Sequence, residues 1–98
     1  MSWSDVIELG TLTEVTQYGE TIVSYVYREV FADKKSVRSK EFYESRLLGL
    51  KPELMFEVRT SEYNEEPKLK FNSKVYDIIR TYEKGEFTEL ICSAVLNG

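Results

Sequence analysis

The chain has 98 residues and a net charge of −4 at pH 7, from 13 Lys and Arg against 17 Asp and Glu. This length predicts one small domain, 1–98, with a single core, and 42% hydrophobic and 13% aromatic residues are typical of a folded chain rather than a disordered one. The acidic balance argues against a duplex-DNA-binding protein that relies on overall positive charge.

Two strands are expected first. Residues 6–12 predict a short strand, and polar residues 13–17 predict a loop that leads into a turn at Tyr18-Gly19. Residues 21–33 are dense in β-branched and aromatic side chains on both faces, with Tyr25 and Phe31 on one face and Val30 on the other. We therefore expect this second strand to be covered on both sides.

A short helix is expected next, in the segment KKSVRSKEFYESRLLGL (34–50). Ser39 is the predicted N-cap, Glu41 lies in the first turn, where the helix dipole favours an anion, and Gly49 can end the helix. The apolar residues of this segment follow helical spacing: Phe42, Tyr43, Leu47 and Leu48. Because a helix of about ten residues is marginal alone, we expect it to dock against something.

Period-two alternation returns after Pro52. Leu54, Phe56 and Val58 share one face of residues 54–59, which predicts a half-buried strand. Residues 61–67 form an acidic loop that we expect to be solvated. Two strands, 68–71 and 74–82, meet tightly at Asn72-Ser73, because Asn tolerates the left-handed conformation. A turn at 83–85 leads into a last strand, 86–96, in which Cys92 faces inward.

The order of these elements predicts a mainly β fold. About six short antiparallel strands, with the only long excursion between the second and third, are typical of a small barrel or sandwich that limits its exposed edges. No internal repeat or linker divides the chain. The stretch MSWSDVIELG has no basic region followed by an apolar run, and no stretch approaches the roughly 18 apolar residues of a membrane helix. We therefore expect a soluble protein without membrane contact.

Residues for catalysis are missing from the sequence. Without histidine no Ser/His or Cys/His nucleophile pair can form, and Cys92, as the only cysteine, excludes an intrachain disulfide and metal sites with several Cys or His ligands. Its predicted role is a small buried side chain in a reducing compartment. The five glycines lie too far apart for a phosphate-binding loop. The Glu65-Glu66 pair lacks the alternating Asp or Asn residues and the glycine of an EF-hand loop. We expect no enzyme activity, no metal and no cofactor.

Charge is unevenly distributed along the chain. Residues 34–50 carry five basic and two acidic side chains, a local charge of +3, which leaves −7 for the remainder: Lys34, Lys35, Arg38, Lys40 and Arg46 against Glu41 and Glu44. This asymmetry is consistent with simple solubility patterning, and equally with contact to an acidic partner surface, to DNA or to a neighbouring copy.

Several elements together resemble a known family. The order VYREVFADKKSV, SKEFYES, GLKPELMFEV, LKFNSKVYDIIRTY and ELIC resembles the head-to-tail joining (head closure) proteins of tailed bacteriophages and prophages. The resemblance covers about residues 6–94. No single piece is diagnostic, but KSV, EFY, GLKPE and VYDIIRTY in this order and spacing are jointly specific.

The resemblance implies a fold and a function. The fold is a small antiparallel β-barrel whose connection between the second and third strands carries the helix. The function is structural: such proteins join as a ring below the portal or its adaptor, close the DNA-filled head and form the docking surface for the tail. The implied partners are further copies of the chain, the portal complex, a tail terminator or tail protein, and the double-stranded DNA in the channel. The implied location is the virion, assembled in the bacterial cytoplasm.

We interpret residues 35–48 as an assembly element that reaches a neighbouring subunit, the portal complex or the DNA channel. The residues predicted to form this interface are Lys35, Ser36, Val37, Arg38, Lys40, Phe42, Tyr43, Arg46 and Leu47. The alternative is that Phe42 or Leu47 caps the barrel within one monomer, which accounts for the helix equally well.

Two rival functions remain open at this point. A tail-completion or tail-terminator protein is also a small β-rich ring former. A single-stranded nucleic-acid-binding barrel is suggested by the lysines of KLKF and by four tyrosines that can stack bases, although at strand spacing such residues are more often part of a core or sheet face: Tyr25, Tyr27, Tyr63 and Tyr76.

Overall fold

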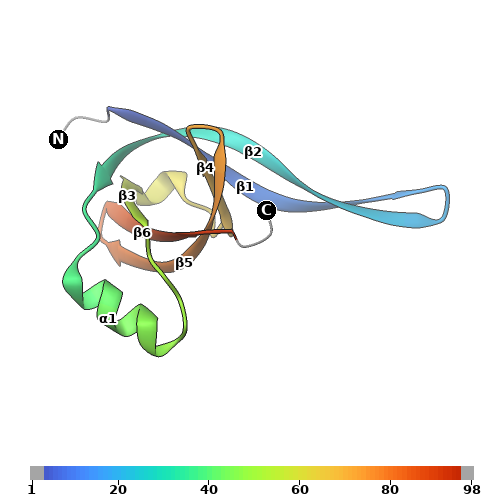
Figure 1. Ribbon diagram of the computed structural model, residues 1–98. Helices are drawn as coiled ribbons and strands as arrows, with labels where there is room; N and C mark the ends of the chain where they lie inside the picture. The colour runs from blue at the N-terminus through green and yellow to red at the C-terminus, as the bar shows by residue number, and fades with distance from the viewer. Residues whose placement is uncertain (1–3, 96–98) are drawn as a thin grey trace.

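The computed structural model describes residues 4–95, which form one closed antiparallel β-barrel with one α-helix (Figure 1). Around the barrel the strand order is β1-β2-β3-β6-β5-β4. The strands are β1 (Asp5–Gln17), β2 (Glu20–Lys35), β3 (Leu54–Arg59), β4 (Lys68–Phe71), β5 (Lys74–Lys84) and β6 (Phe87–Ala94). Helix α1 (Ser39–Leu47) lies in the β2–β3 connection, and a 3-10 turn, η1 (Thr60–Glu62), follows β3. The predicted six-stranded barrel with one helix between the second and third strands is confirmed.

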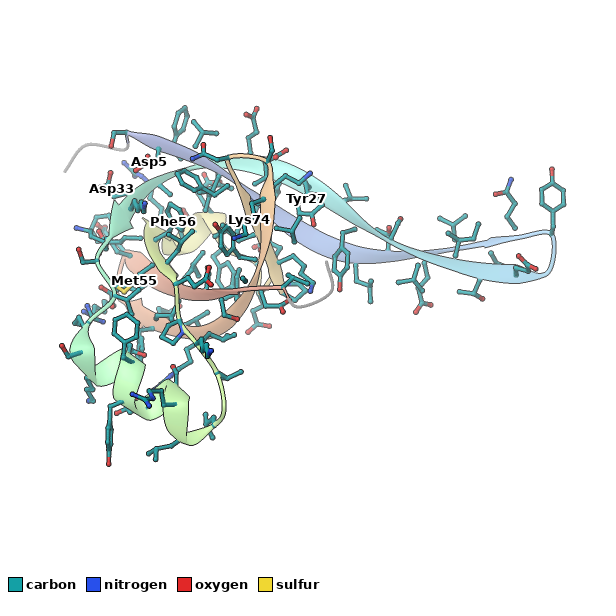
Figure 2. The ribbon with its side chains drawn as sticks, viewed as in Figure 1. Asp5, Tyr27, Asp33, Met55, Phe56 and Lys74 are labelled. Atoms are coloured by element: carbon teal, nitrogen blue, oxygen red, sulfur yellow. The ribbon has the colours of Figure 1, made fainter. Side chains whose placement is uncertain are left out.

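The barrel interior holds the hydrophobic core. Its side chains come from all six strands: Ile7, Leu9, Val30, Ala32, Phe56, Val58, Leu69, Tyr76, Leu90 and Cys92. Phe56 points into this core and meets Phe71 edge to face at 5.0 Å, whereas its neighbour Met55 points out toward α1 (Figure 2). Alternation along β3 and β6 therefore divides the interior face from an outer face, on which Met55 and Ile91 are paired neighbours.

Strands β1 and β2 extend beyond the barrel as a two-stranded arm. They pair continuously from Asp5↔Ala32 to Gln17↔Glu20, but β1 also pairs with β4 only over residues 8–10, and β2 pairs with β3 only over residues 33–35. Residues 11–26 therefore project from the barrel, and the overall extents are 48 × 31 × 24 Å (Figure 1). We name residues 11–26 the arm.

The arm corrects two sequence-based expectations. Residues 13–17 are the end of a long strand rather than a loop, since the predicted turn at Tyr18-Gly19 closes the hairpin with both residues at positive φ. The second strand is not covered on both sides: its first seven residues are exposed, and Phe31 is exposed as well. Its apolar composition predicts a strand correctly, but local composition does not show where the neighbouring strands end.

Strand β3 is buried on both faces, not half-buried as predicted, because Met55 and Glu57 on its outer face are buried as well as Phe56 and Val58 on its inner face. The acidic loop is likewise not solvated throughout. Glu66 is buried, and its Oε2 accepts hydrogen bonds from the guanidinium of Arg28 on β2, with Nη2 at 2.6 Å. This pair fixes the loop to the barrel wall.

The β4–β5 hairpin is confirmed, with Asn72 and Ser73 both in the left-handed region that a two-residue turn requires. The β5–β6 turn falls at Gly85-Glu86 rather than at 83–85. Strand β6 ends at Ala94, and the predicted strand end at Leu96 lies outside the described residues.

Strand β5 contains a β-bulge that sequence alternation did not reveal. Ile78 pairs with Cys92 and Arg80 pairs with Ile91, so Ile79 is one extra residue on β5. A bulge reverses which side chains face outward beyond it. Arg80 consequently shares the outer face with Ile91, next to α1.

Candidate assembly surface

Helix α1 begins one residue earlier than its predicted cap implies. Arg38 is the N-cap residue, without a side-chain capping bond, and Ser39 is the first helical residue, so the predicted Ser39 cap is wrong. The C-terminus is as predicted: Gly49 has φ +75°, and the amides of Gly49 and Leu50 donate to the carbonyl oxygens of Arg46 and Ser45. This pair of bonds is a Schellman motif, which ends the helix firmly.

The orientation of α1 is the opposite of what its apolar residues suggest. The buried residues of the helix are Glu41 and Ser45, whereas its four large apolar residues are exposed by 44–72%: Phe42, Tyr43, Leu47 and Leu48. Leu47, which is 72% exposed, does not cap the barrel, whereas Phe42 is only 44% exposed, so the alternative stays open for that residue. The helix docks through polar contacts and presents an apolar face to solvent.

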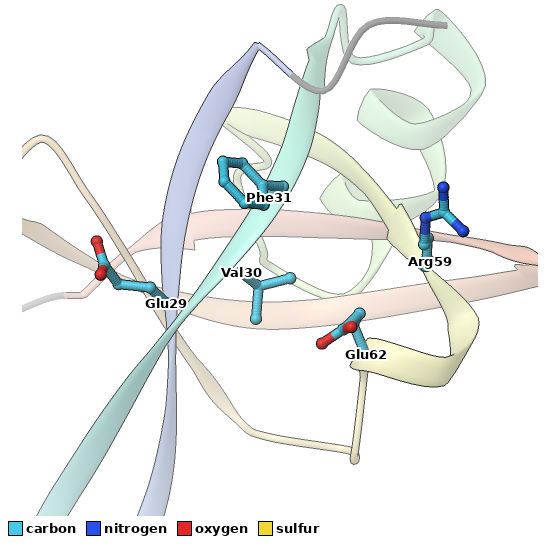
Figure 3. Close-up of a pocket in the computed structure, with 5 residues that line it drawn as sticks. All are labelled: Glu29, Val30, Phe31, Arg59 and Glu62. Carbon is cyan, nitrogen blue, oxygen red and sulfur yellow. The ribbon is translucent and has the colours of Figure 1, made fainter.

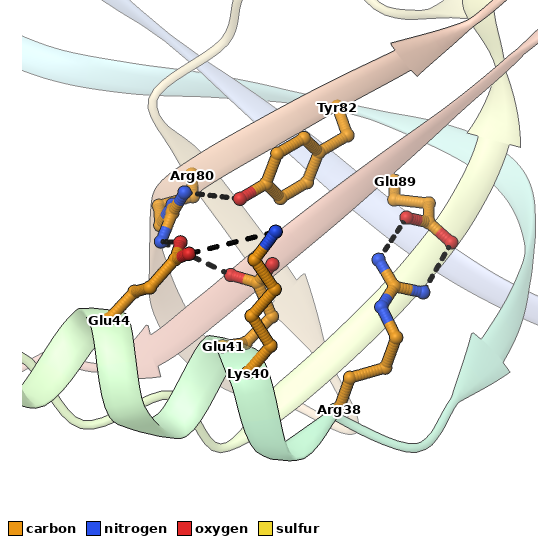
Figure 4. Close-up of polar contacts among 7 residues, drawn as sticks. All are labelled: Arg38, Lys40, Glu41, Glu44, Arg80, Tyr82 and Glu89. Atoms are coloured by element: carbon orange, nitrogen blue, oxygen red, sulfur yellow. Dashed lines mark hydrogen bonds and ion pairs between the residues drawn. The ribbon is translucent and has the colours of Figure 1, made fainter.

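Arg80 on β5 holds the polar face of α1 (Figure 4). Its Nη1 lies 2.6 Å from Oε2 of Glu44 and 3.5 Å from Oε2 of Glu41, and its Nη2 donates to the hydroxyl of Tyr82. The hydrogen bond from Arg80 lowers the pKa of Glu44, and burial followed by the contact with Glu41 raises the pKa of Tyr82. The β-bulge is what directs Arg80 to this position.

A second anchor holds the residue before the helix. Arg38 grips Glu89 on β6 with two hydrogen bonds, Nη2 to Oε1 at 2.6 Å and Nη1 to Oε2 at 3.1 Å, and Nζ of Lys84 lies 3.4 Å from Oε1 (Figure 4). The Glu89 side chain is only 6% exposed. The hydrogen bond from Arg38 is the largest of the effects that lower the pKa of Glu89. Arg38 is thus an internal anchor.

Most of the nine predicted interface residues lie on the surface. Eight are exposed: Lys35, Ser36, Arg38, Lys40, Phe42, Tyr43, Arg46 and Leu47. Val37 is half-buried, and Arg38 is occupied by Glu89. A hollow on the outer side of α1 brings five residues together: Ser39, Phe42, Tyr43, Arg46 and Leu47. We name these five residues with Lys40 the α1 face; it is apolar at its centre and carries two cations.

The residues that position α1 were not predicted from the sequence. Glu41 was predicted only as a helix-start residue, and Arg80, Tyr82 and Glu89 were not connected with the helix at all. One signal was present: the adjacent Ile78-Ile79 pair breaks the alternation of β5, as a bulge does. The ion pairs themselves join residues 36 to 51 positions apart, which no local pattern indicates.

The four tyrosines divide between core and surface. Tyr76 is buried in the core, and Tyr63 packs against it while donating to the carbonyl oxygen of Glu66. Tyr25 and Tyr27 lie on the outer face at the base of the arm, 6.5 Å apart, each with a β4 lysine over its ring, at 5.5 Å and 4.3 Å. These cation–π contacts fasten the arm to β4.

A cleft opens beside β2, where its pairing with β3 has stopped (Figure 3). Five residues line its space of about 520 Å³: Glu29, Val30, Phe31, Arg59 and Glu62. Two carboxylates and one guanidinium surround apolar side chains, without a nucleophile. Within residues 4–95 no group of three or more Cys, Asp or Glu side chains is placed to hold a metal ion. No helix in that range is long and apolar enough to cross a lipid bilayer.

The fold and the surface together define a small closed barrel with an outward apolar helix face. A scan against protein-family models and a search of curated proteins found no match to this chain.

Proposed function

We propose that this protein is a structural component of a phage or prophage virion that joins the head to the tail. In this role several copies form a ring below the portal complex, close the DNA-filled head and present the surface to which the tail attaches. The proposal rests on the sequence resemblance described above and on one structural observation. That observation is a helix in the β2–β3 connection that docks by its polar side and exposes its apolar side.

This orientation supports an assembly role because it leaves apolar side chains exposed to water, where a partner could bury them. Fully burying one Leu side chain contributes about 1.5–3 kcal/mol, so Leu47 and Leu48, which are 72% and 70% exposed, represent several kcal/mol that the isolated chain does not use. Exposed apolar patches on small proteins mark interaction sites. A structural protein in a multi-subunit joint uses such patches, whereas an enzyme needs a catalytic constellation, which the cleft beside β2 lacks.

The charges on the α1 face suit contact with an acidic partner or with DNA, both of which the proposed role requires. Arg46 has no ion-pair partner among residues 4–95, and Lys40 makes only an exposed contact of 3.8 Å with Glu44. Such cations are available to an acidic partner or to DNA phosphates. The rest of the chain is acidic, which suits a channel wall along which DNA slides without sticking.

The experiment that tests this function mixes purified protein with DNA-filled, tailless heads. Density added at one vertex, seen by electron microscopy, together with DNA that stays protected from nuclease, is the expected result. Binding to tail tubes alone would instead identify a tail-completion or tail-terminator protein, and binding to neither would refute both. A variant with Tyr43→Ser and Leu47→Ser should lose binding, while Glu83→Gln at the exposed end of β5 serves as the matched control.

A second candidate function has one observation in its favour. Tyr25 and Tyr27 lie beside Lys68 and Lys70 on one outer surface, an arrangement that single-stranded nucleic acid can contact through stacking and phosphate pairing. However, the lysine ammonium groups already lie over the rings, and Lys68 is also paired with Asp77. Saturable binding of an oligothymidine that weakens with salt would support this function, and no binding at low salt would remove it.

A further inference from the structure

We propose that the acidic arm of one copy docks on the α1 face of the next copy. This contact deepens the proposed function, on which its place in a ring rests, by naming the two surfaces through which copies would join. Both surfaces belong to the same chain, both are apolar and exposed, and their charges are opposite. The occupant of the α1 face is thus a second copy.

The arm has more apolar surface than an isolated hairpin needs. Val15, Ile22 and Val26 are each about half exposed on one side of it, and Leu12 and Val23 are similarly exposed on the other. A two-stranded ribbon without a third strand is at best marginally stable in water. The arm therefore gains stability when another surface covers one of its sides.

The arm and the α1 face are electrostatically complementary. Residues 11–26 contain Glu14 and Glu20 and no Lys or Arg, so the arm carries a charge of −2. The α1 face carries Arg46, which has no ion-pair partner among residues 4–95, and Lys40, which is 77% exposed and lies 3.8 Å from Glu44, while the carboxylates of Glu41 and Glu44 are turned inward to Arg80. The inward turn matters, because it leaves the outer side of the helix basic.

Geometry requires two copies for this contact. The arm leaves the barrel on the side away from α1, so it cannot fold back onto its own helix (Figure 1). Its base is fastened, with the Tyr27 ring over Gly10 and under Lys70. Seven residues of strand span about 23 Å and nine residues of helix about 14 Å, so the arm is long enough to cross the whole α1 face.

The surface area of the chain agrees with an interface of this size. The chain exposes 6619 Å², whereas a compact monomer of 11.5 kDa exposes about 5800 Å². The excess of about 800 Å² reflects the projecting arm and is similar in size to the share of one partner in a specific interface of standard size. Because the two docking surfaces differ, the contact is heterologous, and repetition of it generates a ring when the rotation closes.

A charge-exchange experiment tests the contact directly. One variant carries Glu14→Lys and Glu20→Lys in the arm, and the other carries Lys40→Glu and Arg46→Glu on α1. Glu14 and Glu20 lie on opposite sides of the arm, so whichever side docks, each variant places like charges at its own contact. We therefore expect self-association, followed by sedimentation velocity at low salt, to weaken at least about tenfold. In an equal mixture every contact between unlike copies again joins opposite charges, so association should return to within about threefold of the wild type.

Controls separate this contact from general effects of charge and folding. Glu83→Lys with Glu86→Lys makes the same change in net charge as the arm variant, at the exposed β5–β6 turn, and should leave association unchanged. Val15→Thr with Ile22→Thr, on the side of the arm that also carries Val26, should weaken association without altering the circular dichroism spectrum. Reversed variants that associate as the wild type does, a mixture that stays monomeric, or a wild-type chain that is monomeric at about 1 mM would each overturn the proposal.

The outcome is independent of the proposed virion function. Charge exchange that restores association in a protein that binds no heads would leave the contact standing and remove the function. Binding to heads by either reversed variant alone, with wild-type occupancy at the vertex, would leave the function standing and remove the contact. If the mixture does not associate and the α1 face instead binds a different protein from the tail, that face serves the tail protein, which would overturn the proposal.

Discussion

Replacing Arg38 by methionine should destabilise the protein in a pH-dependent way. The variant keeps the backbone of the N-cap and most of the side-chain volume, but removes both hydrogen bonds to Glu89. A charged hydrogen-bonded pair contributes about 1.5–3 kcal/mol, and breaking one leaves the buried Glu89 carboxylate with only Lys84 nearby. Since 45% of the Arg38 side chain is in contact with water, we expect the lower part of this range, about 1.5 kcal/mol at pH 7.

The sign of the pH dependence follows from the lowered pKa of Glu89. A carboxyl group whose pKa is lower in the folded state stabilises that state above the unfolded pKa of about 4.3, and this contribution disappears as the pH falls through the folded pKa. The difference between wild type and Arg38→Met should therefore be full at pH 7 and shrink steadily below about pH 4. In a Glu89→Gln background the same substitution should cost clearly less.

Urea unfolding at pH 7 and pH 3 measures this effect, and thermal unfolding should show a decrease of roughly 6–12 °C at neutral pH. Lys40→Met is the matched control, because it removes an exposed cation that is two residues away and should change stability by less than about 0.5 kcal/mol. An equal loss at both pH values, or no coupling with Glu89→Gln, would show that the pair does not anchor the helix as described.

Three further predictions concern the barrel and the helix. Ser45→Ala should raise the free energy of unfolding by about 0.5–1 kcal/mol in urea titrations, since the buried Oγ has no hydrogen-bond partner within residues 4–95 and alanine favours helix. Gly10→Ala should lower it by about 1–2 kcal/mol and change the near-ultraviolet tyrosine signal, because the new Cβ would lie 2.6 Å from the Tyr27 ring. Burial raises the pKa of Cys92 to about 12, which lowers its thiolate fraction at pH 8 by about three orders of magnitude, so its reaction with a thiol reagent should be at least about 100-fold slower in the native protein than in denaturant; rapid labelling would contradict its inward position.

The sequence predicts the barrel because its signals are local. Alternation at Leu54, Phe56 and Val58, the Asn72-Ser73 turn and the helix end at Gly49 each depend on neighbouring residues, and the structure confirms all three. Pairing within a hairpin can also continue a strand through polar residues, as it does at residues 13–17 of β1. The composition of those residues alone predicts a loop. The arm was missed because its exposure depends on where β3 and β4 end rather than on its own residues.

The candidate site was predicted only in part, for the same physical reason. The segment 35–48 and its exposed apolar residues follow from helical spacing and charge, whereas the direction in which the helix faces does not. That direction depends on Arg80, whose outward position requires the bulge at Ile79, and on the distant carboxylate Glu89. Arg38 therefore changes role from a predicted interface cation to an internal anchor, and a charge reversal there would test folding rather than assembly.

The inverted helix links the stability of the monomer to the proposed assembly. Rotating α1 by half a turn would bury Leu47, which is 72% exposed, and return Glu41 to water, and the apolar burial alone favours that arrangement in the lone chain by about 1.5–3 kcal/mol. Arg80 and its two carboxylates prevent that rotation, because leaving the guanidinium on the barrel wall without them would cost a desolvated charge. The polar contacts thus keep the apolar side outward, where the arm of a neighbouring copy can cover it, so weakening the Arg80 contacts should reduce association even though no residue of the α1 face is changed.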